Sequence, residues 1–420
     1  MRLKRLYCLM LLAAVACQVA AQPCDGHLRL VFAGDLMGHM PLHKAAQQPD
    51  GSYDYEPCFR YVKDYVESAD LAILNLEVTL AGKPYTGFPC FSSPDAYAAA
   101  ARDAGFDIFA TANNHSVDKG RRGIERTLRI LDSLDIPHFG TYADQQQRLE
   151  TYPLIVNRNG IRLALLNYTY GTNGIAVPRP NVVNLIDTLQ MLQDIKKAQR
   201  FGADFIVALM HWGIEYQRHN NKEQQRIARW LFDHGCGAVV GVHPHVVQNL
   251  AIDANPDNDR YPEPVVYSLG NFFSNQQDED CNGGIMFELE LLKQGGKTEV
   301  YSCAYMPVFV HRAVVEGGRR QYRIVPSSDA LSYPDLYGLG AADLNRLKRF
   351  DLSTRDLLQD CQAGLGSLYR IQETRFYDNG QPAWRRRQRV PYFDYGTPFY
   401  GHPLRCVAWR SRISSPGVAR

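Results

Sequence analysis

The chain has 420 residues, of which 45% are hydrophobic and 21% are charged. This composition is ordinary for a folded globular protein and argues against a mostly disordered chain. The formal net charge of +2 argues against a nucleic-acid partner, because nucleic-acid-binding proteins usually carry a strong basic surplus. A chain of this length can form one large α/β domain with an appendage, or two modest domains.

The first 21 residues have the features of a signal peptide. Residues 1–5 are basic, residues 6–16 are apolar but too few to span a bilayer, and Val19-Ala20-Ala21 fits a small-residue cleavage site. We therefore predict export of the mature chain to the periplasm, the cell surface or the medium. The alternatives are a buried N-terminal helix and, as another form of export, lipoprotein processing at Cys17.

Eight cysteines follow the predicted signal peptide: Cys24, Cys58, Cys90, Cys236, Cys281, Cys303, Cys361 and Cys406. An even number in an exported chain allows disulfides, although their pairing cannot be derived from the sequence. The absence of Cys-x-x-Cys pairs argues against a structural zinc site. For Cys236, beside a strand-like run, a buried free thiol is the alternative.

Short apolar runs alternate with amphipathic stretches from residue 27 to about residue 292. The short runs are predicted as buried strands, at residues 28–33, 71–76, 108–111, 161–166, 205–210 and 238–241. The amphipathic stretches have apolar positions at helical spacing and are predicted as helices, at residues 56–68, 95–104, 120–134, 184–199 and 222–234. Such alternation is typical of βα units in a layered α/β domain.

Later strand-like segments follow one another with few helices between them, at residues 265–269, 285–291, 300–305 and 322–326. We predict that they are antiparallel additions to the same body. After about residue 325 the chain becomes rich in Ser, Pro, Tyr and Gly, and residues 341–362 are predicted as a helix. We therefore divide the mature chain into a domain of residues 27–325 and a C-terminal extension of residues 326–420, to which no role is assigned.

Polar side chains with metal-binding potential stand where the predicted strands end. They are Asp35 and Glu77 after the first two strands, Asn114 and His115 after the third, and His211, His243 and His245 after two later strands. Because sites in open α/β sheets form outside the carboxyl ends of the strands, we expect these side chains to meet. In extended backbone, His243 and His245 would point to the same side and suit a divalent transition metal.

The types of ligand indicate which chemistry is expected. Imidazole and carboxylate without cysteine suit zinc, manganese or iron. More than four candidate ligands, with Glu77 able to bridge, favour a centre of two divalent metal ions that activates a water as nucleophile. His115 is then predicted to protonate a leaving group or to hold an oxyanion. The alternative is a polar cleft that holds no metal.

Aromatic and amide residues near these motifs are predicted to form the walls of the site. Tyr168, Tyr170 and Asn173 are expected to line a substrate wall, and residues 86–94 are a second candidate rim.

Four further polar residues are expected to support the ligands or to touch the substrate. Glu215 and Tyr216 are expected to shape the cleft or to contact the ligands, with a strand-to-loop hydrogen-bond network as the alternative. Asp118 is also expected to support the ligands or to touch the substrate. Asn271 is expected to cap its own turn rather than reach the site.

Six motifs occur in a fixed order over roughly residues 28–310. They are Gly34-Asp35-Leu36-Met37, Asn75-Leu76-Glu77, Asn113-Asn114-His115 with Asp118 and Gly120, His211-Trp212-Gly213-Ile214-Glu215-Tyr216, Gly241-Val242-His243-Pro244-His245 with Gln248, and Tyr267-Ser268-Leu269-Gly270-Asn271-Phe272. Together they resemble the CapA family of poly-γ-glutamate capsule synthesis proteins, within the calcineurin-like metallophosphatase superfamily. The resemblance implies a four-layer α/β/β/α sandwich of metallophosphatase type, with a dinuclear metal site at one edge.

The resemblance also implies a role for each candidate ligand. Asp35 and His245 correspond to ligands of the first metal, Glu77 to the bridging carboxylate, Asn114, His211 and His243 to ligands of the second metal, and His115 to the catalytic histidine.

Two positions depart from the phosphatase pattern and put ordinary phosphomonoesterase activity in doubt. Met37 stands where the superfamily has a histidine, and Glu77 stands in place of an aspartate. His39 follows Met37 and is expected either to enter the site as a ligand or only to line it.

By this resemblance we expect an exported protein of capsule, poly-γ-glutamate or envelope polymer metabolism. The expected activity is metal-dependent hydrolysis or transfer on an anionic polymer or a small-molecule substrate, at a γ-glutamyl amide or a phosphoester. The alternatives are a non-catalytic polymer-binding assembly or export factor that retains the metal site, and an adhesion module with a relic site. We also expect association with membrane-bound capsule machinery.

Overall fold

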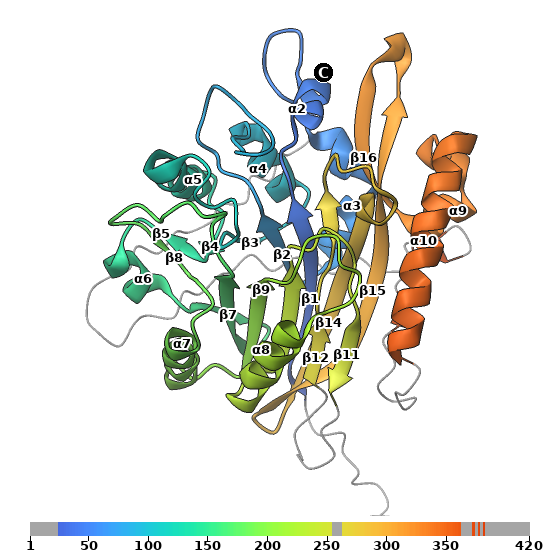
Figure 1. Ribbon diagram of the computed structural model, residues 1–420. Helices are drawn as coiled ribbons and strands as arrows, with labels where there is room; N and C mark the ends of the chain where they lie inside the picture. Colours follow the sequence, from blue (N-terminus) through green and yellow to red (C-terminus); the bar gives the residue numbers. More distant parts are fainter. Residues whose placement is uncertain (1–23, 254–262, 363–371, 374–376, 379–380, 383–420) are drawn as a thin grey trace, which may run out of the picture.

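The computed structural model describes residues 24–253, 263–362, 372–373, 377–378 and 381–382. Two β-sheets pack face to face, and helices cover the outer face of each (Figure 1). The expected four-layer α/β/β/α sandwich with a C-terminal extension is therefore confirmed. The predicted signal peptide, with the alternative processing site at Cys17, lies outside the described residues.

The first sheet is built around β1, which pairs in parallel with β2 on one side and antiparallel with β14 on the other. Its strands run in the order β16 (Arg320–Pro326), β15 (Lys297–Val314), β14 (Gly283–Gln294), β1 (Cys24–Leu36), β2 (Leu71–Leu76), β3 (Ile108–Ala110) and β4 (His138–Phe139), with β13 (Asn271–Phe273) beside β1 and β17 (Gln372–Glu373) beside β15. β14, β15 and β16 are antiparallel neighbours, as predicted.

The second sheet has a parallel centre with antiparallel edges. Its order is β11 (Leu250–Asp253), β12 (Glu263–Val266), β10 (Ala238–Val242), β9 (Phe205–His211), β7 (Ile161–Thr169) and β6 (Leu154–Arg158). The predicted antiparallel addition at residues 265–269 is wrong, because β12 pairs in parallel with β10. β11 runs antiparallel to β12, so the chain reverses twice and returns to the direction of β10. Two short ribbons join β5 (Thr141–Tyr142) to β8 (Val182–Val183) and β18 (Tyr377–Asp378) to β19 (Gln381–Pro382).

All the predicted helices are present, in the predicted order, together with three short helices within the described residues that were not predicted. The helices are α2 (Met40–Ala46), α3 (Glu56–Ser68), α4 (Asp95–Asp103), α5 (Gly120–Ser133), α6 (Gln145–Thr151), α7 (Thr188–Arg200), α8 (Lys222–Asp233), α9 (Ser327–Ser332) and α10 (Ala341–Gln362), with short 3₁₀ turns η1 (Glu279–Cys281), η2 (Glu316–Gly318) and η3 (Pro334–Tyr337). α2, α6 and α9 were not predicted, because six or seven residues are too few to show a helical period.

The alternation of side chains along β1 divides the core into two layers. Leu28, Leu30 and Phe32 point between the sheets and join the cluster that includes β7, β9 and β10. Val31 and Ala33 point the other way and pack under α3 and α4. Because β1 is buried on both faces, its sequence is a near-continuous apolar run, interrupted by Arg29, that ends close to Asp35 of the site.

Part of the C-terminal extension packs against the domain. Phe309 of β15 and Val325 of β16 form a cluster with Leu347 and Phe350 of α10, and α9 and α10 lie beside these strands in Figure 1. Within the described ranges, none of the helices combines the length and the apolar character that crossing a bilayer requires.

The cysteines whose side chains the structure describes form no disulfide with one another; they are Cys58, Cys90, Cys236, Cys281 and Cys303. Cys236 is buried, as in the free-thiol alternative.

We predict that Gly34→Ala destabilises the protein by about 1–3 kcal/mol, the cost typical of overpacking. A Cβ at Gly34 would lie 2.0 Å from the carbonyl oxygen of Gly270, the residue directly before β13. Urea unfolding measures the change, with Gly171→Ala as the control, since a Cβ there meets no atom within 4 Å. Equal transition midpoints for the two variants would contradict the prediction.

Candidate metal centre

The carboxyl ends of strands from both sheets meet at one edge of the sandwich. The predicted ligands stand there: Asp35 near the end of β1, Glu77 directly after β2, Asn114 in the loop after β3, His211 at the end of β9, and His243 and His245 in the loop after β10. All six are buried, with at most 3% of each residue exposed. The first sheet therefore provides the carboxylates and the amide, and the second sheet provides the imidazoles.

The buried ligands form two triplets that share one carboxylate. In the first triplet, Asp35, Glu77 and His245 each offer a ligand atom within 4.8 Å of the other two. In the second triplet, Glu77, His211 and His243 do the same. Glu77 therefore lies where a carboxylate can bridge two cations.

Unsatisfied atoms in these triplets fit the binding of cations. Both carboxylate oxygens of Glu77, Nδ1 of His211 and Nδ1 of His243 are buried and have no hydrogen-bond partner in the described protein. Burying such groups without partners is costly. A divalent cation in each triplet would satisfy the oxygens of Glu77, and His211 faces Glu77 through Nε2, 3.7 Å from Oε1. Asn114 adds an oxygen beside the second triplet, since its Oδ1 lies 2.9 Å from Nε2 of His211.

The protonation of the site without metal follows from burial. Burial raises the pKa of Glu77 well above its usual range, and the neighbouring charge of Asp35 raises it further. Burial also lowers the pKa of His243 to about 3, and the pKa of His211 falls well below its usual value. Both histidines are therefore neutral at physiological pH, which is the form that binds metals.

Asp35 joins the two sheets through hydrogen bonds. Its Oδ1 accepts from Nδ2 of Asn75 at 2.8 Å, and its Oδ2 lies 3.1 Å from Nδ1 of His245. Oδ2 also accepts from the backbone N–H of His243 at 3.3 Å. Burial is the largest effect and raises the pKa of Asp35, but the hydrogen bond and charge of His245 together with the other hydrogen bonds to this carboxylate, including that from Asn75, lower it below its usual value.

The predicted extended backbone at the His-Pro-His motif is wrong. His243 has a φ of 102° and His245 a φ of 60°, a conformation that side chains other than glycine rarely adopt. The backbone N–H of Tyr216 donates to the carbonyl of Pro244 at 2.8 Å, which holds this turn. The two imidazoles therefore belong to different triplets rather than to one metal, with ring centroids 6.0 Å apart.

His115 lies beside the triplets, in the loop that also carries Asn114. Its Nδ1 lies 2.8 Å from Oδ2 of Asp118, and its backbone N–H donates to Oδ1 of Asn113 at 3.0 Å. These contacts orient the ring and leave Nε2 as the atom available for proton transfer. Asp118 therefore contacts the candidate catalytic histidine, and it belongs to neither triplet.

One side of the centre is formed by the predicted wall after β7. The ring of Tyr170 lies 4.6 Å from that of His243 and the residue is 48% exposed. Asn173 accepts a hydrogen bond from Nδ2 of Asn114 at 3.2 Å. The expectation for Tyr168 is wrong: its ring is buried and its hydroxyl donates to Asp194 at 2.9 Å. Tyr168 lies within β7 and packs into the core, whereas Tyr170 follows the last residue of the strand and is half exposed.

His39 and Tyr216 lie near His245 of the first triplet. Nδ1 of His39 accepts from the backbone N–H of Asn275 at 3.3 Å, and His39 belongs to neither triplet, so it lines the site. Burial lowers the pKa of His39 to about 4. The ring of Tyr216 lies 6.1 Å from that of His245, and the residue is 51% exposed. Glu215 acts on the site through its charge, which helps to raise the pKa of Glu77.

Asn271 has both a structural contact and an unsatisfied atom. Its Nδ2 donates to Gln276 at 2.7 Å and to the carbonyl of Cys281 at 3.0 Å, which holds the loop after β13. Its Oδ1 is buried without a partner among the described residues, beside Asp35 in the strand pairing.

Two residues at the centre were not predicted individually. Asn75, which orients Asp35, gives a weak signal as a polar residue inside the buried strand β2. Phe91 packs against His115 with ring centroids 4.6 Å apart. The sequence predicts only a rim at residues 86–94, because an apolar residue in a loop does not reveal its neighbours.

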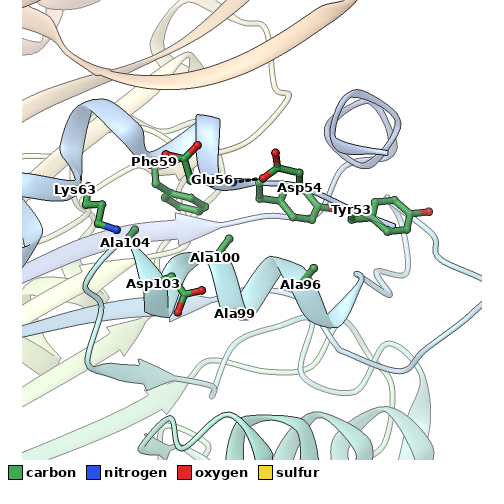
Figure 2. A pocket seen from close by; sticks show the side chains of 11 residues that line it. Tyr53, Asp54, Glu56, Phe59, Lys63, Ala96, Ala99, Ala100, Asp103 and Ala104 are labelled. Carbon is green, nitrogen blue, oxygen red and sulfur yellow. Dashed lines mark hydrogen bonds between the residues drawn. The ribbon is translucent and has the colours of Figure 1, made fainter. Parts of the chain in front are cut away.

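A separate cavity of about 240 Å³ lies between α3 and α4. Figure 2 shows Phe59 and Lys63 of α3 facing Ala100 and Asp103 of α4 across it. None of the candidate metal ligands lines this cavity.

Comparison with known sequences finds a family and relatives that are named for capsule synthesis. The sequence profile of the family described as "Bacterial capsule synthesis protein PGA_cap" matches residues 29–276. The chain is 26% identical to the capsule biosynthesis protein CapA of Bacillus anthracis, over 59% of this chain and 60% of that protein. It is also 26% identical to the PGA biosynthesis protein CapA of Bacillus subtilis (strain 168), over 69% of this chain and 73% of that protein. The chain thus spans less than two thirds of the length of the first relative and more than two thirds of the length of the second.

Solved structures of similar shape include phosphoesterases and nucleotidases. The Haemophilus influenzae NAD nucleotidase NadN has 13% identity and a TM-score of 0.43, covering 79% of this chain and 60% of that chain. The calcineurin-like phosphoesterase YfkN from Bacillus subtilis has 13% identity and a TM-score of 0.40, covering 78% of this chain and 100% of that chain.

We predict that the purified protein carries about two transition-metal ions per chain after reconstitution with Mn or Zn, as a dinuclear centre requires. Glu77→Ala, which removes the carboxylate shared by both triplets, is expected to lower the content of both ions. Elemental mass spectrometry of dialysed protein measures it. Glu215→Gln is the control and is expected to retain metal, because Glu215 is in neither triplet. A metal-free wild-type protein after reconstitution would rule out the centre.

Proposed function

Since this chain belongs to the bacterial capsule synthesis family PGA_cap, we propose that it is a metal-dependent hydrolase or transferase that acts on an anionic polymer of the cell envelope. The observation that carries the proposal is the pair of triplets that share Glu77. A protein that only binds a polymer does not need two adjacent cation sites with an oriented histidine beside them.

The residues of the site would have different roles in such a reaction. Two divalent cations, when bound, supply Lewis acidity that favours attack by water on a phosphoester or an amide. Asp35 and Glu77 hold the negative charge of the centre, and Asn75 fixes the orientation of Asp35. His115, oriented by Asp118, protonates the leaving group from Nε2.

The half-exposed tyrosines provide the surface on which the polymer lies. Tyr170 lies beside His243 and Tyr216 lies beside His245, so a chain that passes over both histidines contacts both rings. The scissile group is a γ-glutamyl amide or a phosphoester. The similarity to the PGA biosynthesis protein CapA of Bacillus subtilis supports the amide.

The place of action follows from the first 21 residues, which carry the features of a signal peptide. We place the mature protein outside the cytoplasm, or tethered by a lipid at Cys17, in association with membrane-bound capsule machinery. Manganese, zinc and iron all suit the ligand set.

We predict that His115→Ala lowers turnover by about 100-fold or more, as the loss of a general acid does, while metal content stays at the wild-type level. The assay incubates the protein with phosphoesters and γ-glutamyl polymers, with and without a chelator. His219→Ala, an exposed histidine outside both triplets, is the matched control. Loss of metal from His115→Ala would make His115 a ligand, and retention of polymer without chelator-sensitive turnover would make the protein a binder.

We predict that Tyr170→Ala raises KM by about 10-fold and changes kcat little, because a substrate wall contributes equally to the ground state and the transition state. Tyr170→Phe keeps the ring over His243 and is expected to stay near the wild-type KM. Steady-state kinetics on the substrate found in the screen measures both. A fall in kcat at unchanged KM would show that Tyr170 acts in the chemical step instead.

A further inference from the structure

Phe91 connects the loop before α4 to the candidate catalytic histidine. The loop closes on itself, because the backbones of Thr86 and Ser92 exchange hydrogen bonds of 3.0 and 2.9 Å. Phe91 lies at the base of this loop and is fully buried, and its carbonyl accepts from Oγ1 of Thr79 at 2.6 Å. Its position is therefore fixed from both sides.

The backbone of Phe91 binds the carboxylate that orients His115. Its N–H donates to Oδ2 of Asp118 at 2.6 Å. The same oxygen lies 2.8 Å from Nδ1 of His115. The other oxygen of Asp118 has no hydrogen-bond partner in the part of the chain that the structure describes. The direction of this carboxylate is thus set by two contacts, and one of them comes from Phe91.

The ring of Phe91 packs between two imidazoles of the site. It meets His115 with ring centroids 4.6 Å apart and an angle of 84° between the planes. It meets His39 at 5.4 Å and 82°. Such edge-to-face contacts are a preferred geometry for aromatic pairs. A ring in this place prevents His115 from turning away from Asp118.

We propose that Phe91 is a positioning residue for the reaction at this centre. Its backbone holds Asp118, and its ring holds the plane of His115, so that Nδ1 stays on Asp118 and Nε2 stays available for proton transfer. This inference rests on the proposed function for its kinetic consequence. Its structural consequence, one fixed orientation and tautomer of His115, holds whatever the substrate is.

Phe88 provides a matched control in the same loop. It is the same residue type three positions earlier, and it is 77% exposed. Phe88→Leu therefore changes the loop surface and leaves the contact with His115 in place. Phe91→Leu keeps an apolar residue and the backbone N–H but removes the edge-to-face contact, and Phe91→Met conserves the volume should the leucine variant fail to fold.

The test observes the histidine ring directly. Nitrogen-15 NMR of histidine-labelled protein at one fixed pH, with His115 assigned from the His115→Ala spectrum, reports its tautomer and the ring-current shift from Phe91. We expect Phe91→Leu to shift the His115 ring signals and to mix its tautomers, as Asp118→Asn does, while Phe88→Leu leaves them unchanged. In the turnover assay, kcat of Phe91→Leu is expected to fall about 10- to 100-fold, in line with the cost of a small misplacement, at near-constant KM and metal content.

Two outcomes separate this inference from the proposed function. If folded Phe91→Leu and Phe91→Met give the wild-type His115 signals, the positioning role of Phe91 is wrong even if the protein is an enzyme. If the His115 signals change as expected but no substrate is turned over, the positioning role holds and the proposed function fails. A loss of kcat without any change in the His115 signals would also overturn the inference.

Discussion

The burial of two carboxylates at the junction of the sheets is the constraint on which the rest of the site depends. Glu77 is fully buried next to Asp35, and neither of its oxygens has a hydrogen bond in the described protein. A pair of this kind is stable only if one group is protonated or if cations neutralise both. The histidines of the second sheet lie where they can complete two cation sites, and cations bound there would offset the electrostatic cost of burying the two carboxylates.

The fold maintains this junction by close packing rather than by flexible loops. β1 meets the backbone at Gly270 at a distance that leaves no room for a Cβ on Gly34. The loop after β10 places His243 and His245 at positive φ, which costs free energy of about 1–3 kcal/mol per residue and separates the two imidazoles. The strain is local to the ligands, where strained backbone is commonly found, and the hydrogen bond from Tyr216 to Pro244 supports it.

Local periodicity was sufficient to place most of the elements. β2 and α3 have the predicted bounds, and so does α10 at residues 341–362, because each is long enough to show its own period. The observed bounds of α7 and β14 differ from the predicted bounds, residues 184–199 and 285–291, by a few residues at their ends. Helix caps and strand pairing decide where an element stops. The direction of β12 could not be predicted, because it depends on the intervening strand β11 and not on the apolar run itself.

The pattern of the sequence determined the α/β class and the types of ligand, since apolar runs followed by polar residues reveal both where strands end and what stands there, and the family resemblance of its motifs implied the four-layer arrangement. The tertiary structure alone decided which ligands share a cation, how His243 and His245 turn, and that Phe91 reaches Asp118. The physical reason is the distance along the chain: Asp35 and the backbone of His243 are 208 residues apart. Contacts of that separation are set by the packing of two sheets, and no local pattern of residues encodes them.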